Sequence, residues 1–331
     1  MKVLLFKDNY EKIKESGVGK AIKHQELALK KAGVDFTDNP KEDFDLVHIN
    51  TIFPKSYFFA KKTLKKGKKV VYHAHSTKED FKNSFLFSNT LAGFFKWWIT
   101  KCYKTSTLIL TPTNYSKKLI ESYGIKKEIY PISNGIDLEF WQNKKAYADE
   151  FDKKFDSYGK KVIVSVGLYI KRKGILDFVE LAKRLPQYEF YWFGYLDLKL
   201  VPKEVKKAVQ TKLPNLHFPG YVDRNFLRSA YARANLFFFP TYEETEGIVL
   251  LEALAMKTDS LIRDIEIYRD IKAGEEIYKA KDIEGFEEKI CGIIEKNLPS
   301  LREQGYKLVE NNSIEAIGDK LKTYYERALK L

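Results

Sequence analysis

Short apolar runs alternate with amphipathic stretches along the chain, and this alternation constrains the fold more than any other feature of the sequence. The apolar runs predict strands at residues 2–6, 46–49, 69–73, 107–111, 129–132, 161–166, 188–193, 216–218, 236–239 and 260–263. The amphipathic stretches predict helices at residues 19–32, 116–123, 174–185, 224–234 and 247–257. Strands that alternate with helices indicate an α/β fold of parallel sheets covered on both faces.

The length of the chain predicts two domains. It has 331 residues, more than a single domain usually contains. Hydrophobic residues make up 44% of it, which is enough to build packed cores and argues against disorder. The alternation pauses in the polar stretch 137–158. We therefore predict doubly wound, Rossmann-like domains at residues 1–142 and 143–312.

The sequence predicts a cytoplasmic protein that is dissolved or sits on a membrane surface. Cys102 and Cys291 are too few for a disulfide framework and indicate a reducing compartment. Residues 1–6 resemble a short buried strand rather than a signal peptide. No uninterrupted apolar run approaches the roughly 18 residues that a membrane span needs.

Positive charge is concentrated in the first half of the chain. Residues 1–140 hold 25 Lys and Arg against 15 Asp and Glu, which is +10 of the total formal charge of +13. Residues 61–69 form the densest cluster and include Lys65 and Lys66. Such a surface suits an anionic partner such as nucleic acid, a membrane leaflet or a polyphosphate. The alternative to an anionic partner is that these lysines only increase solubility or complement the partial negative charge of a helix C-terminus.

The segment 240–255 carries the strongest chemical signal. Glu244 and Glu252 stand on either side of Gly247, where a predicted strand gives way to a predicted helix. A helix N-terminus presents unpaired backbone N–H groups and a partial positive charge, so it suits a phosphate. The two carboxylates can accept hydrogen bonds from sugar hydroxyls. The segment therefore fits a nucleotide-sugar better than a bare nucleotide, although capping and solvated charge would also explain a glutamate pair near a helix start.

The spacing Pro-Thr-x-x-Glu-x-x-Gly-x-x-x-x-Glu-Ala resembles the donor-site signature of the retaining glycosyltransferases of family four. The resemblance implies the GT-B fold, in which two Rossmann-like domains face a cleft and the C-terminal helix, here 313–331, returns to the first domain. It implies that Glu252 binds the ribose and that the backbone of Gly247 and Ile248 binds the diphosphate. Glu244 would orient the transferred sugar. Glu246 stands where the family usually has an apolar residue.

Further segments match the family in the expected order. Lys173 corresponds to the family lysine beside the diphosphate. Leu168 stands where the family has arginine, and Arg172 or Lys171 is expected to replace that cation; a solvated charge cluster is the alternative reading. Glycines at a strand-to-helix turn let backbone approach a ligand, although a plain turn is the alternative reading. The resemblance implies that the loop with Gly17 and Gly19 lies under the donor phosphates and the acceptor.

Two histidines follow the predicted strand 69–73. By resemblance, His75 contacts the transferred sugar near the reaction centre, and we expect His73 to be a core residue. Only five histidines and no nearby cysteine argue against a metal site here. No Asp-x-Asp motif stands at a strand end, so we expect no cofactor beyond the UDP-sugar donor and at most a non-essential divalent cation.

The segment 91–104 is both aromatic and basic and includes Trp97 and Trp98. Aromatic rings at headgroup level and lysines on anionic lipid would dock this segment on a membrane. An amphipathic helix packed on the first domain's sheet is the other interpretation. Because basic residues gather in the same half, we favour membrane docking, with Lys65 and Lys66 taking part.

Within the family, the runs at residues 16–25 and 73–85 look most like the second-step glycolipid synthases of low-GC Gram-positive bacteria. That resemblance implies transfer of glucose or galactose from UDP-glucose or UDP-galactose to monoglucosyl-diacylglycerol. The enzyme would be peripheral on the inner face of the cell membrane and would not bind nucleic acid. Two alternatives stay open: a glycosyltransferase of capsule or cell-wall polysaccharide synthesis, and a non-catalytic GT-B binding protein.

Overall fold

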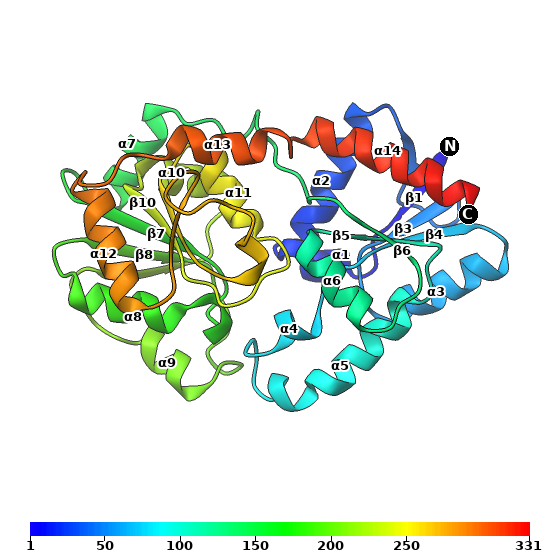
Figure 1. The fold of residues 1–331 in the computed structure, drawn as a ribbon, viewed down its shortest axis with the longest axis horizontal. Coiled ribbons are helices and arrows are strands. Elements are labelled where there is room, and N and C mark those ends of the chain that lie inside the picture. The colour runs from blue at the N-terminus through cyan, green and yellow to red at the C-terminus, as the bar shows by residue number, and fades with distance from the viewer. The chain divides into compact units, whose positions relative to one another are not determined.

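The computed structural model describes all of residues 1–331, which form two compact units (Figure 1). The N-terminal unit contains residues 1–81, 90–137 and 311–331, and the C-terminal unit contains residues 82–89 and 138–310. Each unit is an α/β structure built around one six-stranded parallel sheet, as the alternation of apolar and amphipathic segments predicts.

The sheet of the N-terminal unit has the strand order β2-β1-β3-β4-β5-β6, and all neighbouring strands are parallel. Its strands are β1 (Lys2–Phe6), β2 (Asp35–Thr37), β3 (Leu46–Ile49), β4 (Lys69–His73), β5 (Leu108–Thr111) and β6 (Glu128–Pro131). Its helices are α1 (Tyr10–Ile13), α2 (Gly17–Lys31), α3 (Pro54–Lys65), α4 (Lys78–Phe81), α5 (Ser88–Tyr103), α6 (Asn114–Ser122) and α14 (Ile314–Lys330), of which α5 starts in segment 82–89.

The sheet of the C-terminal unit has the order β12-β11-β10-β7-β8-β9 and is also parallel throughout. Its strands are β7 (Val162–Val166), β8 (Glu189–Phe193), β9 (Leu216–Gly220), β10 (Leu236–Phe239), β11 (Ser260–Arg263) and β12 (Tyr278–Ala280). Its helices are α7 (Lys145–Phe155), η1 (Lys171–Lys173), α8 (Ile175–Arg184), α9 (Lys203–Val209), α10 (Arg224–Arg233), α11 (Ile248–Ala255), η2 (Glu266–Tyr268), α12 (Ile283–Ile294) and α13 (Arg302–Glu310).

Two of the four edge strands, β2 and β12, are the strands that the apolar pattern did not predict. Each has three residues and includes a charged side chain. Strands this short carry no recognisable alternation, so their place in the sheet depends on pairing with a longer neighbour.

The strands of the N-terminal unit send alternate side chains to opposite faces of the sheet. On β4, Val70 and Tyr72 belong to the core under α3 and α5, whereas Val71 belongs to the core under α2 and α14. This period of two is the geometry of a strand buried on both faces. The histidines of β3 and β4, His48 and His73, follow the same period and lie on the face with α2 and α14.

Helix α14 at the end of the chain packs on α2, where Figure 1 shows it in red beside the blue helix. Gly318 allows this close approach because a Cβ at that position would overlap the carbonyl oxygen of Ala28. A parallel β-bridge between Ile136 and Ser313 joins the start of α14 to the end of segment 90–137. The last helix is therefore part of the N-terminal unit.

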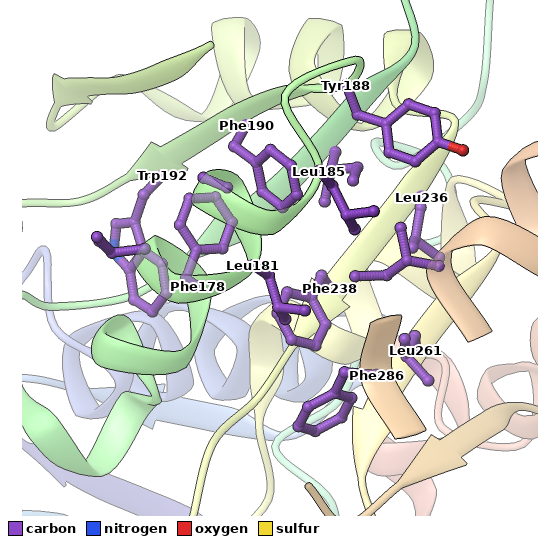
Figure 2. Packing of buried hydrophobic residues seen from close by; sticks show 14 of the residues in the cluster. Phe178, Leu181, Leu185, Tyr188, Phe190, Trp192, Leu236, Phe238, Leu261 and Phe286 are labelled. Atoms are coloured by element: carbon purple, nitrogen blue, oxygen red, sulfur yellow. The ribbon is translucent and has the colours of Figure 1, made fainter. Parts of the chain in front are cut away.

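Aromatic side chains fill the core of the C-terminal unit between α8 and the sheet (Figure 2). The ring of Phe178 lies 5.3 Å from that of Phe190 and 5.1 Å from that of Trp192, both nearly edge-on. Edge-to-face pairs of this kind are the favoured contact of buried aromatic rings. None of the helices of either unit combines the length and the apolar character that crossing a membrane requires.

Candidate active site

The predicted donor-site residues of the C-terminal unit lie in the segments that follow two neighbouring strands. Strand β7 leads into η1, and strand β10 leads into the loop 240–247 and then α11. The two strands pair in parallel, so their carboxyl ends lie at the same edge of the sheet. Ligands of doubly wound sheets bind beyond this edge. The fold therefore brings Lys173 and Glu244 together, although they are 71 positions apart in the chain.

Glu244 is buried and surrounded by donors. Lys173 Nζ donates a hydrogen bond to its Oε1, Thr241 Oγ1 donates another at 2.9 Å, and Arg172 Nη1 lies 3.7 Å away. Burial would raise the pKa of this carboxyl, but the two cations and the two hydrogen bonds outweigh burial and hold the pKa below its usual value. Glu244 is therefore a carboxylate at neutral pH.

Arg172 is engaged by the protein itself. Its Nε donates to Ser84 Oγ at 3.1 Å, and its Nη1 donates to the backbone carbonyl of Glu243 at 2.6 Å. The backbone carbonyl of Arg172 in turn accepts from Tyr242 N–H at 2.8 Å. These contacts attach segment 82–89 and η1 to the loop that carries Glu244. Arg172 thus has a clear supporting role in this unit, and its contact with the donor stays a prediction.

The position where the family has arginine carries no cation. The Leu168 side chain is 41% exposed. The neighbouring cation Lys171 forms an ion pair with Glu204, with 3.0 Å between Nζ and Oε1. Of the predicted cations, Lys173 is the one that lies beside the signature carboxylate with its ammonium on Oε1.

Gly247 is required by the backbone at the start of α11. Its φ of +93° lies in the region that favours glycine, and a Cβ there would lie 2.6 Å from the hydroxyl of Tyr268. That hydroxyl donates to the backbone carbonyl of Glu246 at 3.0 Å. The helix then begins at Ile248, so the first N–H groups of α11 have no preceding helical carbonyl to pair with. This is the geometry that favours an anion.

Glu252 lies in the second turn of α11 and is 1% exposed. The hydroxyl of Tyr231 donates to its Oε2 at 3.1 Å. Burial, together with this carboxylate, raises the pKa of Tyr231 well above its usual value, so the phenol keeps its proton and remains a donor. Glu246, the residue that departs from the family pattern, is also buried.

The candidate residues of the N-terminal unit gather where β3 and β4 end. His75 follows β4, and its Nε2 lies 2.7 Å from Oδ1 of Asn50, the residue after β3. Gln25 of α2 forms two hydrogen bonds of 2.8 Å with Asn50 and lies 3.0 Å from Nδ1 of His73. The imidazole rings of His73 and His75 stack at 4.1 Å.

The histidine cluster extends to His48, whose ring stacks on that of His73 at 5.5 Å and whose Nδ1 lies 2.6 Å from the hydroxyl of Tyr325 in α14. Burial lowers the pKa of His48 and of His75 to about 3 and that of His73 well below its usual value. All three rings are therefore neutral at physiological pH.

Sequence reasoning missed the partners of His75. Asn50 follows a predicted strand next to the one that carries the histidines, so it was within reach of the rule that functional side chains follow parallel strands. Gln25 lies inside α2, and its one signal was its place in the glycolipid-synthase-like run 16–25. The third histidine and Tyr325 gave no such signal, because their contact depends on where α14 packs.

The two predicted glycines of the N-terminal unit differ. A Cβ at Gly19 would overlap the backbone of Ile13 and Lys14, so this glycine allows α1 to pack on α2. Gly17 opens α2, and no other group lies within 4 Å of the place that a Cβ would take there. Ser16 Oγ caps the helix by accepting from the N–H of Gly19 at 3.2 Å.

The aromatic and basic segment has two faces. The indole N–H of Trp98 donates to the carbonyl of Ile52 at 2.7 Å, and its ring packs on the core of the N-terminal unit. Trp97 is 49% exposed, and Lys101 Nζ lies over its ring at 4.1 Å from the centroid. Lys65 and Lys66 are exposed at the end of α3. Helix α5 is thus an amphipathic core helix that also carries an aromatic outer face.

Comparison with known proteins agrees with this architecture. Residues 148–312 match the family "Glycosyl transferases group 1", and residues 38–140 match "Glycosyltransferase Family 4". The chain is 40% identical to the processive diacylglycerol alpha-glucosyltransferase of Acholeplasma laidlawii, over 100% of this chain and 99% of the relative. It is 27% identical to the alpha-galactosylglucosyldiacylglycerol synthase of Streptococcus pneumoniae, over 80% of this chain and 73% of the relative.

Solved structures of low sequence identity share the fold. HepE of Anabaena in complex with UDP and glucose has a TM-score of 0.81 at 12% identity, covering 99% of this chain and 100% of that one. The sucrose-phosphate synthase of Thermosynechococcus elongatus has a TM-score of 0.71 at 16% identity, covering 87% and 74%. With its two parallel six-stranded sheets and its whole-length relative, this chain belongs to the family-four, group 1 glycosyltransferases of GT-B fold.

Proposed function

We propose that this protein is a retaining hexosyltransferase that moves glucose from UDP-glucose to a diacylglycerol glycolipid, with monoglucosyl-diacylglycerol as acceptor. The observation that carries the proposal is the 40% identity, over the whole chain, with a relative named as a processive diacylglycerol alpha-glucosyltransferase. A processive enzyme uses the product of one transfer as the acceptor of the next, which fits a glucosylated lipid acceptor. The second relative is also named for a glycosyl-diacylglycerol product.

The geometry of the C-terminal unit supports donor binding in three places. The unpaired N–H groups at Gly247 and Ile248 and the ammonium of Lys173 would hold the diphosphate. The carboxylate of Glu252 would accept hydrogen bonds from the ribose, and that of Glu244 from the transferred sugar. Glu244 suits this role because its depressed pKa keeps it an acceptor at neutral pH.

In the reaction, the bond from the anomeric carbon to the diphosphate oxygen breaks and a bond to the acceptor hydroxyl oxygen forms on the same face of the sugar. The hydroxyl proton passes to the leaving diphosphate. The charge that develops on the leaving group would be stabilised by Lys173 and by the start of α11, and we propose that this replaces a metal ion.

The test is incubation of the purified protein with labelled UDP-glucose or UDP-galactose and with diacylglycerol or monoglucosyl-diacylglycerol, followed by product analysis. We expect a diglucosyl lipid from UDP-glucose and monoglucosyl-diacylglycerol, with the anomeric configuration of the donor retained. If a labelled galactolipid is the main product, the donor is UDP-galactose and not UDP-glucose. Transfer only to water or to soluble saccharides would overturn the lipid acceptor.

We also propose that the N-terminal unit docks on an anionic membrane through α5. Leu91, Phe94 and Trp97 recur every three residues along this helix and are all about half exposed or more. Phe58 of α3 is 65% exposed, and the two helices are joined by a contact of 5.5 Å between the rings of Tyr57 and Trp98. Exposed aromatic residues beside lysines are the composition of an interfacial helix.

Co-sedimentation with vesicles tests this docking surface. We expect the protein to bind vesicles that contain an anionic lipid and to release them as salt rises. The double substitution Phe94→Ala and Trp97→Ala should weaken binding, whereas Tyr158→Ala, which removes a similarly exposed ring from the C-terminal unit, should not. Equal binding by the wild-type protein, the double variant and Tyr158→Ala would exclude α5 as the docking element.

A further inference from the structure

A buried pair of side-chain amides connects the two histidines at the end of β4. Gln25 and Asn50 are 1% and 3% exposed. Gln25 Nε2 donates to Asn50 Oδ1 at 2.8 Å, and Asn50 Nδ2 donates to Gln25 Oε1 at 2.8 Å, so each amide is both donor and acceptor to the other. Gln25 Nε2 also lies 3.0 Å from His73 Nδ1, and Asn50 Oδ1 lies 2.7 Å from His75 Nε2.

The orientation of the amides determines which ring nitrogen carries the proton. Asn50 Oδ1 is an acceptor, so the ring nitrogen 2.7 Å from it, His75 Nε2, must be the donor. Burial lowers the pKa of His75 to about 3, so the neutral ring carries only this one proton. Its Nδ1 is therefore a lone pair. That atom makes no hydrogen bond in the chain and is not among the fully buried polar atoms.

The same pair acts on His73. Gln25 Nε2 donates its second proton to His73 Nδ1 at 3.0 Å, which places the proton of this ring on Nε2. His73 Nε2 is buried and has no partner. A core selected for stability alone would avoid a buried polar atom without a partner. The amide pair thus holds both rings as the Nε2–H tautomer, and this arrangement leaves His73 Nε2 without a hydrogen-bond partner.

We propose that Gln25 and Asn50 are positioning residues that hold His75 as the Nε2–H tautomer, so that Nδ1 accepts a hydrogen bond from a hydroxyl of the transferred sugar. The tautomer depends only on the contacts within the N-terminal unit. The sugar contact depends in addition on the proposed glycosyl transfer. If the oxygen and nitrogen of each amide exchanged places, Asn50 would donate to His75 Nε2. His75 would then carry its proton on Nδ1, and the sugar hydroxyl would have to accept a hydrogen bond from it.

Nitrogen chemical shifts of protein labelled with ¹⁵N-histidine report the tautomer directly, and the five histidines are assigned by single substitutions. For His75 of the wild-type protein we expect a protonated Nε2 and an unprotonated Nδ1. Asn50→Leu removes the acceptor, so it should populate both tautomers and lower kcat about tenfold, which is the effect of one lost polar contact in the transition state. Asn50→Asp keeps an acceptor oxygen and should retain the tautomer and more of the activity than Asn50→Leu.

Tyr325→Phe is the matched control. It removes a buried polar contact from the same histidine cluster, through His48, without touching His75. We expect the His75 tautomer and kcat to stay as in the wild-type protein. A protonated Nδ1 on His75, or an unchanged tautomer in Asn50→Leu, would overturn the positioning role. If the expected tautomer is found in a protein that transfers no sugar, the proposed function fails and the positioning pair stands.

Discussion

Lys173 Nζ donates a hydrogen bond to Glu244 Oε1, and both side chains are at most 15% exposed. The pair joins the loop after β7 to the loop after β10. Neither charge can be removed without leaving the other in a poorly solvated place. In the proposed function, an anionic donor that reaches Lys173 would share this cation with Glu244, so recognition of the sugar and of the diphosphate would be coupled at one point of the C-terminal unit.

Removing either signature carboxylate should reduce catalysis. We expect Glu244→Ala and Glu252→Ala each to lower kcat/KM at least roughly tenfold, because each removes a polar contact proposed for the transition state. Glu244→Gln keeps the shape of the side chain and tests charge alone. The control is Glu266→Ala, an exposed carboxylate of the same unit that pairs with Arg269. Circular dichroism checks folding, and wild-type turnover in folded Glu244→Ala or Glu252→Ala would refute the site assignment.

A side chain at the start of α11 should be costly. Gly247→Ala places a Cβ against the Tyr268 hydroxyl and imposes a φ of +93° on alanine. We expect the free energy of unfolding in urea to fall by about 1–3 kcal/mol, the usual cost of such strain. UDP binding measured by calorimetry should weaken as well, because the first N–H groups of the helix shift. Unchanged stability together with unchanged UDP affinity would contradict this account of Gly247.

The buried histidines should make the N-terminal unit sensitive to acid. Burial lowers the pKa of His48 and His75 to about 3, whereas the unfolded chain protonates near about 6.5. The unfolded state therefore binds more protons between these values, so stability is full above about pH 6.5 and falls as pH drops toward 3.

Urea unfolding at a series of pH values measures this effect. We expect His48 and His75 each to contribute a slope of about 1.4 kcal/mol per pH unit below pH 6.5. His48→Gln should reduce the slope whatever it does to the absolute free energy. A free energy of unfolding that stays level from about pH 6.5 to 5, above the range where carboxylates titrate, would show that these rings are not buried and neutral.

The contact between α14 and α2 depends on Gly318. Gly318→Ala places a Cβ on the carbonyl of Ala28 and should lower the thermal midpoint by several degrees, about the effect of a loss of 1 kcal/mol or more. Gly93→Ala in α5 is the opposite case, because nothing lies within 4 Å of a Cβ there. Alanine in the middle of an open helix should raise the midpoint slightly. Equal midpoints for both variants would show that α14 is not closely packed.

Much of the fold follows from local pattern. The predicted strands at 2–6, 46–49 and 69–73 coincide with β1, β3 and β4, because apolar runs bounded by polar residues carry their own signal. The three-residue edge strands β2 and β12 have no such pattern. The family is likewise readable from the spacing of Glu244, Gly247 and Glu252, since all three lie within nine consecutive residues that lead from a strand into a helix.

For single site residues, too, the sequence identifies the candidates and the tertiary contacts distinguish between them. The sequence matches Lys173 to the family lysine beside the diphosphate, and it offers Arg172 or Lys171 as the replacement for the arginine that is missing at Leu168. The folded unit shows a different contact for each cation. Lys173 Nζ donates to Glu244, whereas the Arg172 guanidinium donates to Ser84 and to the carbonyl of Glu243. Trp97 and Trp98 are neighbours in sequence, yet one is half exposed and the other packs on the core.

The sequence by itself determined the α/β architecture and the glycosyltransferase family, because both follow from patterns of residues close together in the chain. The tertiary structure decided which side chains contact the candidate site residues. His75 meets Asn50 and Gln25 only because α2 and the ends of β3 and β4 come together in the folded unit. Contacts between distant residues depend on packing, and local sequence carries no measure of packing.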